Sequence, residues 1–158
     1  MRILLSPAKK MRRDTDSLPV AGLPAFLDRT REILSWLRSQ SDDQLQKLWN
    51  CSDVIARENI ERLADMDLTV GLTPALISYD GIAFQHMAPA VFTDSALSYV
   101  QEHLRILSGF YGVLRPMDGV TPYRREMQAR VPVSGFRDLY DFWGSSLYEA
   151  SGMKAEFF

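Results

Sequence analysis

Short apolar runs that alternate with longer amphipathic segments constrain the fold of this chain more than any other feature of its sequence. Ile3–Leu5 is an apolar run that Pro7 ends, and residues 106–107 lead into a turn at residues 108–112. The residues between these runs carry helical patterns. Because strands separated by helices are typical of a sheet covered by helices, this order predicts an α/β fold, with a mixed α+β fold as the alternative. The apolar run at Ile3–Leu5 is predicted to be a buried strand.

Three helices are predicted in the first half of the chain. The first lies where apolar residues recur at helical spacing, at Phe26, Leu27, Ile33, Leu34 and Leu37. Ser41 begins the second, because a serine side chain accepts hydrogen bonds from free amides at a helix start. Residues 50–52 interrupt it, and Ser52 or Asp53 caps a third helix with an apolar face of Ile55, Ile60 and Leu63. The segment from Gln44 to Leu63 is therefore predicted to be a helical hairpin.

The next segment carries strand signals. Residues 75–79 form a β-rich run after Pro74 and meet Asp80-Gly81, a dipeptide that suits a tight hairpin turn. We expect a strand, a turn and a short strand there. Thr93 with Asp94 then begins a further helix, since both residue types favour helix starts.

Charge and cysteine content limit the function classes. With 158 residues and 46% hydrophobic residues, the chain is long enough for one globular domain, residues 1–158. A net charge of -2 gives no overall attraction to phosphate, so nucleic-acid binding requires basic residues gathered in one place. The single Cys51 excludes an internal disulfide, and no apolar run approaches membrane-spanning length. These features indicate a cytoplasmic protein without a membrane partner.

Basic residues follow the first predicted strand. Lys9 and Lys10, together with the loop amides after Ser6, suit contact with a phosphate, although a solvated charged turn explains the same residues. The spacing from Ser6 to Lys9 is also that of an activated serine, but the companion motifs of such enzymes are not visible.

A second group of candidate residues lies further along the chain. Glycines within residues 108–118 let a backbone approach a ligand closely, and the forked guanidinium of Arg115 suits a phosphate or carboxylate. A turn that packs its aromatic side chains into the core explains this block equally well. Tyr123 next to Arg124 and Arg125 suits phosphate contact with base stacking, whereas Glu126 can neutralise an arginine in a surface ion pair.

Metal-ligand spacing is lacking in the sequence. His86 and His103 have no partner three or four residues away, so we predict structural roles for both. We also predict that the protein binds neither a metal nor a cofactor. Cys51 lies in the predicted turn between two helices, where a redox-sensitive thiol is the less favoured alternative.

Five widely separated blocks of sequence carry a family resemblance. They are residues 4–9, 79–81, 104–118, 122–127 and 139–144. In this order they are similar to the YaaA family of bacterial peroxide stress proteins, over residues 1 to about 148. The run Leu-Ser-Gly-Phe-Tyr-Gly-Val-Leu-Arg-Pro at residues 107–116 is the most diagnostic. The family continues with an Asn-Leu-Ala-Ser-like segment and a basic C-terminal region that this sequence lacks, so we expect an incomplete domain.

The resemblance implies a function in hydrogen peroxide stress, linked to lowered free iron and to DNA protection. It implies a mixed α/β fold with a positively charged cleft and a helix-hairpin-helix element that binds double-stranded or branched DNA, which we place from Gln44 to Leu63. The family's basic and polar motif positions correspond to Lys9, Arg105, Ser108, Tyr111, Arg115, Tyr123 and Arg124.

The leading hypothesis is a non-enzymatic DNA-binding protein that limits iron-dependent oxidative damage. Its phosphate contacts would be Lys9, Lys10, Arg105, Arg115, Arg124 and Arg125, with Tyr111 or Tyr123 stacking on unpaired bases. The alternative is an enzyme that acts on a nucleotide or base, in a pocket formed by the motifs 6–9 and 108–115. Its reactive side chains would be Ser6, Lys9, Ser108 and Tyr123. Direct iron binding by scattered carboxylates is the third and least favoured hypothesis.

Overall fold

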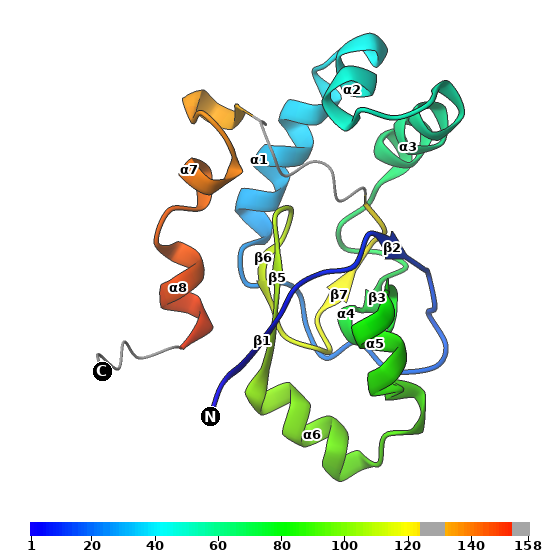
Figure 1. Cartoon of the computed structure of the whole chain (residues 1–158), viewed down its shortest axis with the longest axis vertical. Coiled ribbons are helices and arrows are strands. Elements are labelled where there is room, and N and C mark those ends of the chain that lie inside the picture. The colour runs from blue at the N-terminus through cyan, green and yellow to red at the C-terminus, as the bar shows by residue number, and fades with distance from the viewer. Residues whose placement is uncertain (124–131, 153–158) are drawn as a thin grey trace.

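A computed structural model describes residues 1–123 and 132–152 of the chain (Figure 1). Its central sheet has the strand order β1-β5-β6, formed by Ile3–Leu5, Leu104–Ser108 and Gly112–Leu114. Strand β1 is parallel to β5, and β5 forms an antiparallel hairpin with β6. Two further strand pairs join β2 (Lys10–Met11) to β4 (Tyr79–Asp80) and β3 (Thr73–Pro74) to β7 (Gly119–Val120). The predicted mixed α/β fold is confirmed.

Helices lie around these small sheets. In the first half of the chain they are α1 (Leu27–Arg38), α2 (Asp42–Trp49), α3 (Asp53–Asp65), α4 (Ala75–Ser78) and α5 (Ile82–Met87). In the second half they are η1 (Pro89–Val91), α6 (Asp94–His103), η3 (Val133–Gly135), α7 (Leu139–Trp143) and α8 (Ser146–Ser151). Figure 1 shows α2 and α3 at one end of the molecule and α6 at the other.

The predicted helical hairpin is confirmed as a structure. The Ser41 hydroxyl accepts a hydrogen bond from the backbone amide of Gln44, whose side chain in turn accepts one from the amide of Ser41, so α2 begins with a complete capping box. Asn50 ends α2 in a left-handed conformation, and Ser52 caps α3. The prediction of the apolar face of α3 is partly wrong, because Ile55 is 39% exposed, whereas Leu63 is buried as expected.

The predicted hairpin around Asp80-Gly81 is wrong. Residues Ala75–Ser78 form the short helix α4, because the amides of Ala75 and Leu76 donate to the carbonyl oxygens of Asp118 and Pro116 rather than to a neighbouring strand. Gly81 has a φ of -137°, which is ordinary extended backbone, and it precedes helix α5. A tertiary contact with the loop before β7 therefore overrides the local β preference of these residues.

The strand at Ile3–Leu5 exists, but its predicted burial is wrong. Ile3 is 40% exposed and Leu4 is 37% exposed, because β1 is the edge strand of the three-stranded sheet. The basic segment that follows is not only a loop: Lys10–Met11 forms β2, paired with β4.

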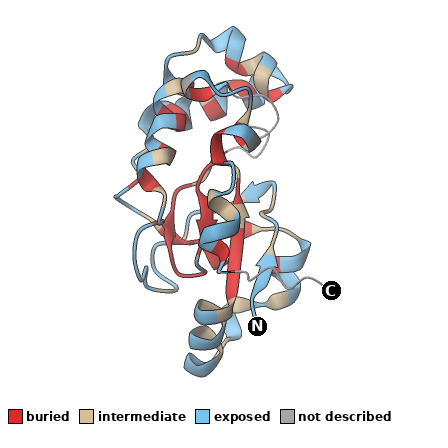
Figure 2. Ribbon diagram, turned by 90° about the vertical axis from the view of Figure 1, so that its left-hand side faces the viewer, coloured by how far each residue is buried: buried red, intermediate tan, exposed pale blue. Residues whose placement is uncertain are grey.

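The core lies where the β5–β6 hairpin meets helix α1 and the C-terminal helices (Figure 2). Ile106, Phe110 and Leu114 of this hairpin are completely buried. Gly112 turns the hairpin with a φ of +80°, and the space that its side chain would occupy is taken by the rings of Trp143 and Phe26. The Trp143 indole nitrogen donates to the carbonyl oxygen of Gly109 at 2.8 Å, which fixes the ring over the turn.

Within residues 1–123 and 132–152, no helix has both the length and the hydropathy needed to cross a bilayer.

Candidate functional site

A surface pocket of about 420 Å³ lies between the start of β1, the β5–β6 hairpin and α6. Four charged side chains line it, and we call it the arginine pocket: Arg2, Arg105, Arg115 and Asp118. The remaining lining residues are Ala21, Gly22, Leu23, Ala25, Gln101, Val113 and Ala150. The pocket therefore combines a strongly charged part with a wall of small apolar side chains.

Arg105 forms the buried part of this pocket. It lies on β5, is only 7% exposed, and donates from Nη1 to the carbonyl oxygens of Gln101 and Leu104 at 2.9 Å and 2.7 Å. Burial, followed by the positive charges of Arg2 and Arg115, lowers the pKa of Arg105. The guanidinium is thus held in place while like charges face it.

Arg115 and Asp118 occupy the turn that follows β6. The Asp118 carboxylate accepts a hydrogen bond from the backbone amide of Arg115 at 2.8 Å, so it fixes the turn and leaves the exposed Arg115 side chain beside the pocket. Burial raises the pKa of Asp118 to about 6, against the effects of this hydrogen bond and of the charges on Arg115 and Arg105. Asp118, the only acid among the described lining residues, is therefore partly protonated at mildly acidic pH and balances less of the arginine charge there.

Arg2 completes the charged part of the pocket. It precedes β1, whose parallel pairing with β5 sets Ile3 opposite Leu104, and its guanidinium donates to the carbonyl oxygen of Glu102. In the part of the chain that the structure describes, none of the three pocket arginines forms an ion pair, and Asp118 alone balances their charge within the pocket. This excess of positive charge favours an anionic ligand.

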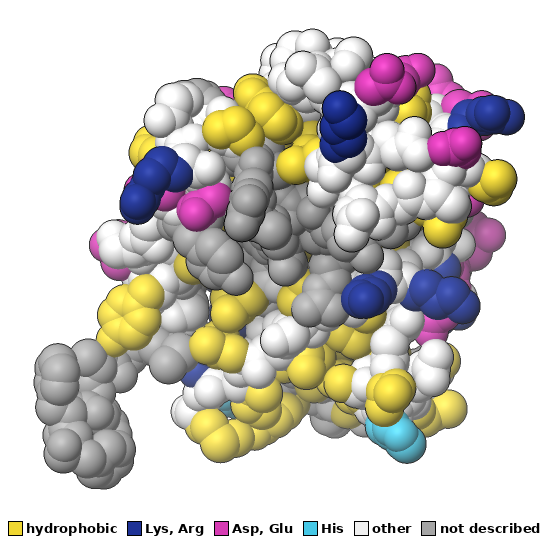
Figure 3. Space-filling model, turned by 45° about the horizontal axis from the view of Figure 1, so that its top comes forward, with side chains coloured by type: hydrophobic (Ala, Val, Ile, Leu, Met, Phe, Trp, Pro, Cys, Tyr) yellow, Lys and Arg dark blue, Asp and Glu magenta, His cyan; other side chains and the backbone are white. Residues whose placement is uncertain are grey.

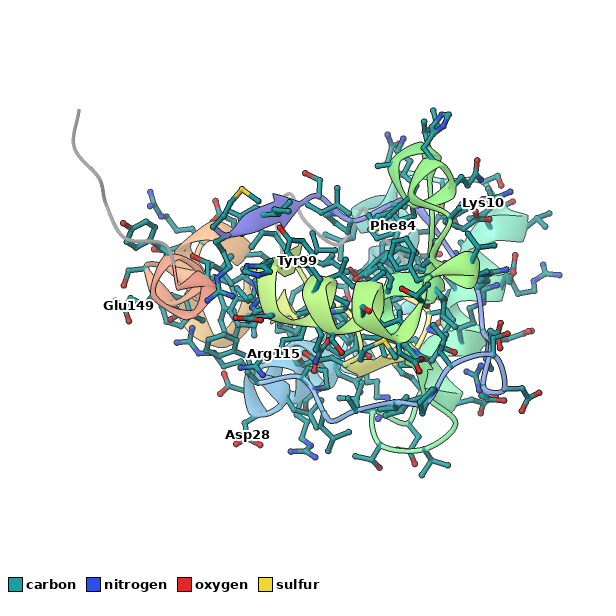
Figure 4. The ribbon with its side chains drawn as sticks, turned by 90° about the horizontal axis from the view of Figure 1, so that it is seen from below. Lys10, Asp28, Phe84, Tyr99, Arg115 and Glu149 are labelled. Atoms are coloured by element: carbon teal, nitrogen blue, oxygen red, sulfur yellow. The ribbon has the colours of Figure 1, made fainter. Side chains whose placement is uncertain are left out.

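The predicted basic residues do not all meet in this pocket. Arg105 and Arg115 line it, whereas Lys9 and Lys10 are exposed on the segment around β2, where Lys10 lies opposite Asp80. Figure 4 shows Lys10 and Arg115 well apart. Arg124 and Arg125 lie outside the described residues. The two lysines therefore do not line the arginine pocket, and a groove shared by all these cations stays a prediction.

Sequence reasoning missed Arg2 and the position of Asp118 in the site. A signal for Arg2 existed, because residues at the start of two parallel, adjacent strands lie at the same edge of a sheet. Pairing the run at Ile3–Leu5 with the run around Ile106 would have placed Arg2 near Arg105.

Ser108, Tyr111 and Tyr123 belong to a buried polar cluster with Tyr79. The Tyr123 hydroxyl is 2.6 Å from the Ser108 hydroxyl and 2.7 Å from the Tyr79 hydroxyl. Ser108 also accepts hydrogen bonds from the amides of Phe110 and Tyr111, and the Tyr111 hydroxyl accepts one from the amide of Thr121. Burial raises the pKa values of Tyr79 and Tyr111 well above their ordinary range. These side chains support the turn, and a role in DNA contact stays a prediction.

Replacing Tyr123 with phenylalanine is expected to lower the free energy of unfolding by about 2 kcal/mol. The change removes the hydroxyl that bonds to the buried hydroxyls of Tyr79 and Ser108, and the loss of such buried hydrogen bonds carries a penalty of this size. Urea denaturation measures the effect. Tyr148→Phe is the control, since Tyr148 is exposed; equal stability of the Tyr123 and Tyr148 variants would contradict the structural role of the cluster.

The residues of the proposed enzyme pocket differ in their exposure. Ser6 and Lys9 are exposed, whereas Ser108 and Tyr123 are buried and bonded to each other. None of the four lines the arginine pocket, nor the smaller pocket of about 200 Å³ between Arg12 and helix α5. A reactive site built from these side chains stays a prediction.

The α2–α3 hairpin lacks an excess of positive charge. Its acidic residues are Asp42, Asp43, Asp53, Glu58, Glu61 and Asp65, and its basic residues are Lys47, Arg57 and Arg62. On the face in Figure 3, which brings this end of the molecule forward, several coloured basic side chains lie near acidic ones, and two basic groups lie side by side at the lower right. The predicted role of this hairpin in DNA binding stays a prediction, which its charge disfavours.

Side chains that could ligate a metal are scattered over the described ranges. Residues 1–123 and 132–152 contain no group of three or more His, Cys, Asp or Glu side chains placed to hold a metal ion. The Nδ1 atom of His103 donates a hydrogen bond to the carbonyl oxygen of Met1 at 2.8 Å, next to the start of β1.

Fold and pocket together define a mixed α/β protein with an arginine-lined surface pocket. A family model described as "Peroxide stress protein YaaA" matches residues 1–154. This match covers nearly the whole chain, so the chain belongs to the peroxide stress protein YaaA family, and the predicted family is confirmed.

Individual relatives agree with this assignment. A protein of Agathobacter rectalis named "UPF0246 protein" is 55% identical over 150 residues, which cover 95% of this chain and 60% of that protein. Proteins of the same name from Lachnoclostridium phytofermentans and Limosilactobacillus reuteri are 52% and 54% identical over 157 and 149 residues. These matches cover 99% and 94% of this chain, and 62% and 60% of the two relatives. The chain thus spans about three fifths of the length of these relatives.

Proposed function

We propose that this protein is a cytoplasmic DNA-binding protein of the peroxide stress response, which limits iron-dependent oxidative damage to DNA. The observation that carries the DNA-binding part is the convergence of Arg2, Arg105 and Arg115 on one pocket with a single acid among its described lining residues. Membership of the peroxide stress family supplies the physiological context.

Phosphate is the DNA group that fits this charge arrangement. Guanidinium groups bind phosphate oxygens through two parallel hydrogen bonds, and each contact displaces counterions from the nucleic acid. Arg115 is exposed and able to meet a backbone phosphate, while Arg105 is held by backbone carbonyl oxygens at fixed geometry. Because backbone phosphates are the same in every sequence, we expect binding without strong sequence preference.

A mobility-shift titration of the chain with a hydroxyl-ended DNA duplex, at about 50 and about 200 mM salt, tests the proposal. We expect Arg115→Ala to weaken binding about tenfold and to reduce the slope of log affinity against log salt by about one, since one phosphate contact is lost. The Arg115 side chain makes no hydrogen bond within the described residues, so its removal leaves the fold intact.

Arg62→Ala is the matched control, because it removes the same charge from α3, where Arg62 pairs with Glu58 at the surface. Affinity should be nearly unchanged in this variant. Salt-independent binding, or an equal loss in both variants, would contradict phosphate binding by the arginine pocket. A loss only in Arg62→Ala would assign DNA contact to the α2–α3 hairpin instead.

A further inference from the structure

We propose that the arginine pocket receives the terminal phosphomonoester of a nucleic-acid strand, and that the protein therefore prefers phosphorylated strand ends to internal backbone phosphates. This inference rests on the proposed DNA-binding function and specifies which phosphate the pocket takes. Charge, depth and the apolar wall of the pocket each support it.

The charge of the pocket matches a doubly charged anion better than a singly charged one. Arg2, Arg105 and Arg115 bring three guanidinium groups to it, and Asp118 is the only acid among the described lining residues. A phosphomonoester carries about -1.5 to -2 near neutral pH and offers three acceptor oxygens, whereas an internal phosphodiester carries one charge. The second charge of a terminal phosphate therefore interacts favourably with guanidinium groups that otherwise repel one another.

Depth separates the two kinds of phosphate further. Arg105 is almost completely buried, and two of its five N–H groups belong to the Nη1 atom that bonds to Gln101 and Leu104. Its other N–H groups have no partner among the described residues and are left for a ligand. An internal phosphate is tethered to the chain on both sides and can reach the exposed Arg115, whereas a terminal phosphate is tethered on one side and can enter as far as Arg105.

The uncharged wall of the pocket would contact the nucleotide that carries the terminal phosphate. Leu23, Val113 and Ala150 line the cavity beside the arginines, and open space adjoins Gly22, where an added methyl group would find no atom within 4 Å. A cavity of about 420 Å³ is large enough for the sugar or base of one nucleotide as well as its phosphate. Apolar contact with that nucleotide would distinguish a strand end from free inorganic phosphate.

Fluorescence anisotropy with a gapped DNA duplex tests the proposal. Four versions of one duplex combine a phosphate or a hydroxyl at the 5′ end of the gap with a phosphate or a hydroxyl at its 3′ end. We expect a phosphate at one of the two ends to increase affinity about tenfold at about pH 7.5, and the 5′ and 3′ versions identify which end enters. A deoxynucleoside monophosphate should compete at a lower concentration than inorganic phosphate.

Arg105→Gln should abolish the preference for a phosphorylated end. Arg115→Gln is a second test that does not depend on the folding of the first variant, because it leaves the buried hydrogen bonds of Arg105 in place. It should reduce the preference. Arg62→Gln should retain it in full. Equal affinity for all four versions, with DNA binding otherwise intact, would overturn this inference and leave the proposed function standing. Absence of binding to every version would overturn both.

Discussion

Replacing Gly112 with alanine is expected to lower the free energy of unfolding by about 3 kcal/mol. Gly112 has a φ of +80°, where an L-residue is strained by about 1–2 kcal/mol. The added methyl carbon would lie 2.9 Å from the Trp143 ring and 3.1 Å from the Phe26 ring, and such overpacking adds about 1–3 kcal/mol. The Trp143 ring is buried and bonded to the carbonyl oxygen of Gly109, which holds it against the turn.

Urea denaturation measures this loss, with Gly22→Ala as the control. Gly22 has no neighbouring atom within 4 Å of the added carbon and no positive φ, so its replacement should change stability by less than about 0.5 kcal/mol. If Gly112→Ala were as stable as Gly22→Ala, the packing of Trp143 against the β5–β6 turn would be wrong.

Replacing Asp118 with asparagine is expected to stabilise the protein at about pH 8 by about 2–3 kcal/mol. Burial raises the pKa of Asp118 to about 6, so the folded protein keeps this proton at a pH where the unfolded chain has already lost it. Stability therefore falls as the pH rises from about 4 to about 6 and stays lower above that range. Asparagine removes the ionisable group and retains an oxygen that can accept from the Arg115 amide.

Urea denaturation of the wild type and Asp118→Asn at about pH 4 and about pH 8 checks this prediction. The gain should be large at the higher pH and should shrink to well under 1 kcal/mol at the lower one. Asp28→Asn is the control, because Asp28 is exposed and pairs with Arg31 at the surface, where such pairs contribute little. A gain that is independent of pH would show that Asp118 is not a buried carboxyl of raised pKa.

Local signals predicted the helical parts of the fold well. Ser41, Ser52 and Thr93 each cap a helix in the way their side chains allow, and the apolar spacing from Leu27 to Leu37 marks the buried face of α1. These features depend on residues within one or two turns of each other, so the sequence alone is sufficient to find them.

Features that depend on distant partners were predicted less well. The β-rich run after Pro74 became a helix because its amides bond to residues 116 and 118, which are far along the chain. The same limit applies to the site: Arg105 and Arg115 were found from their motif, but Arg2 joins them only through the parallel pairing of β1 with β5. Lys9 and Lys10, which follow that strand closely in sequence, do not line the arginine pocket.

A crystal structure of this chain with a short single-stranded oligonucleotide that is phosphorylated at both ends tests the central claim most directly, since it locates the phosphate itself. The account predicts the terminal phosphate in the arginine pocket, with its oxygens about 3 Å from the guanidinium nitrogens of Arg105 and Arg115. A bound strand that contacts the α2–α3 hairpin, or the segment around Lys10, and leaves the pocket without phosphate would contradict it.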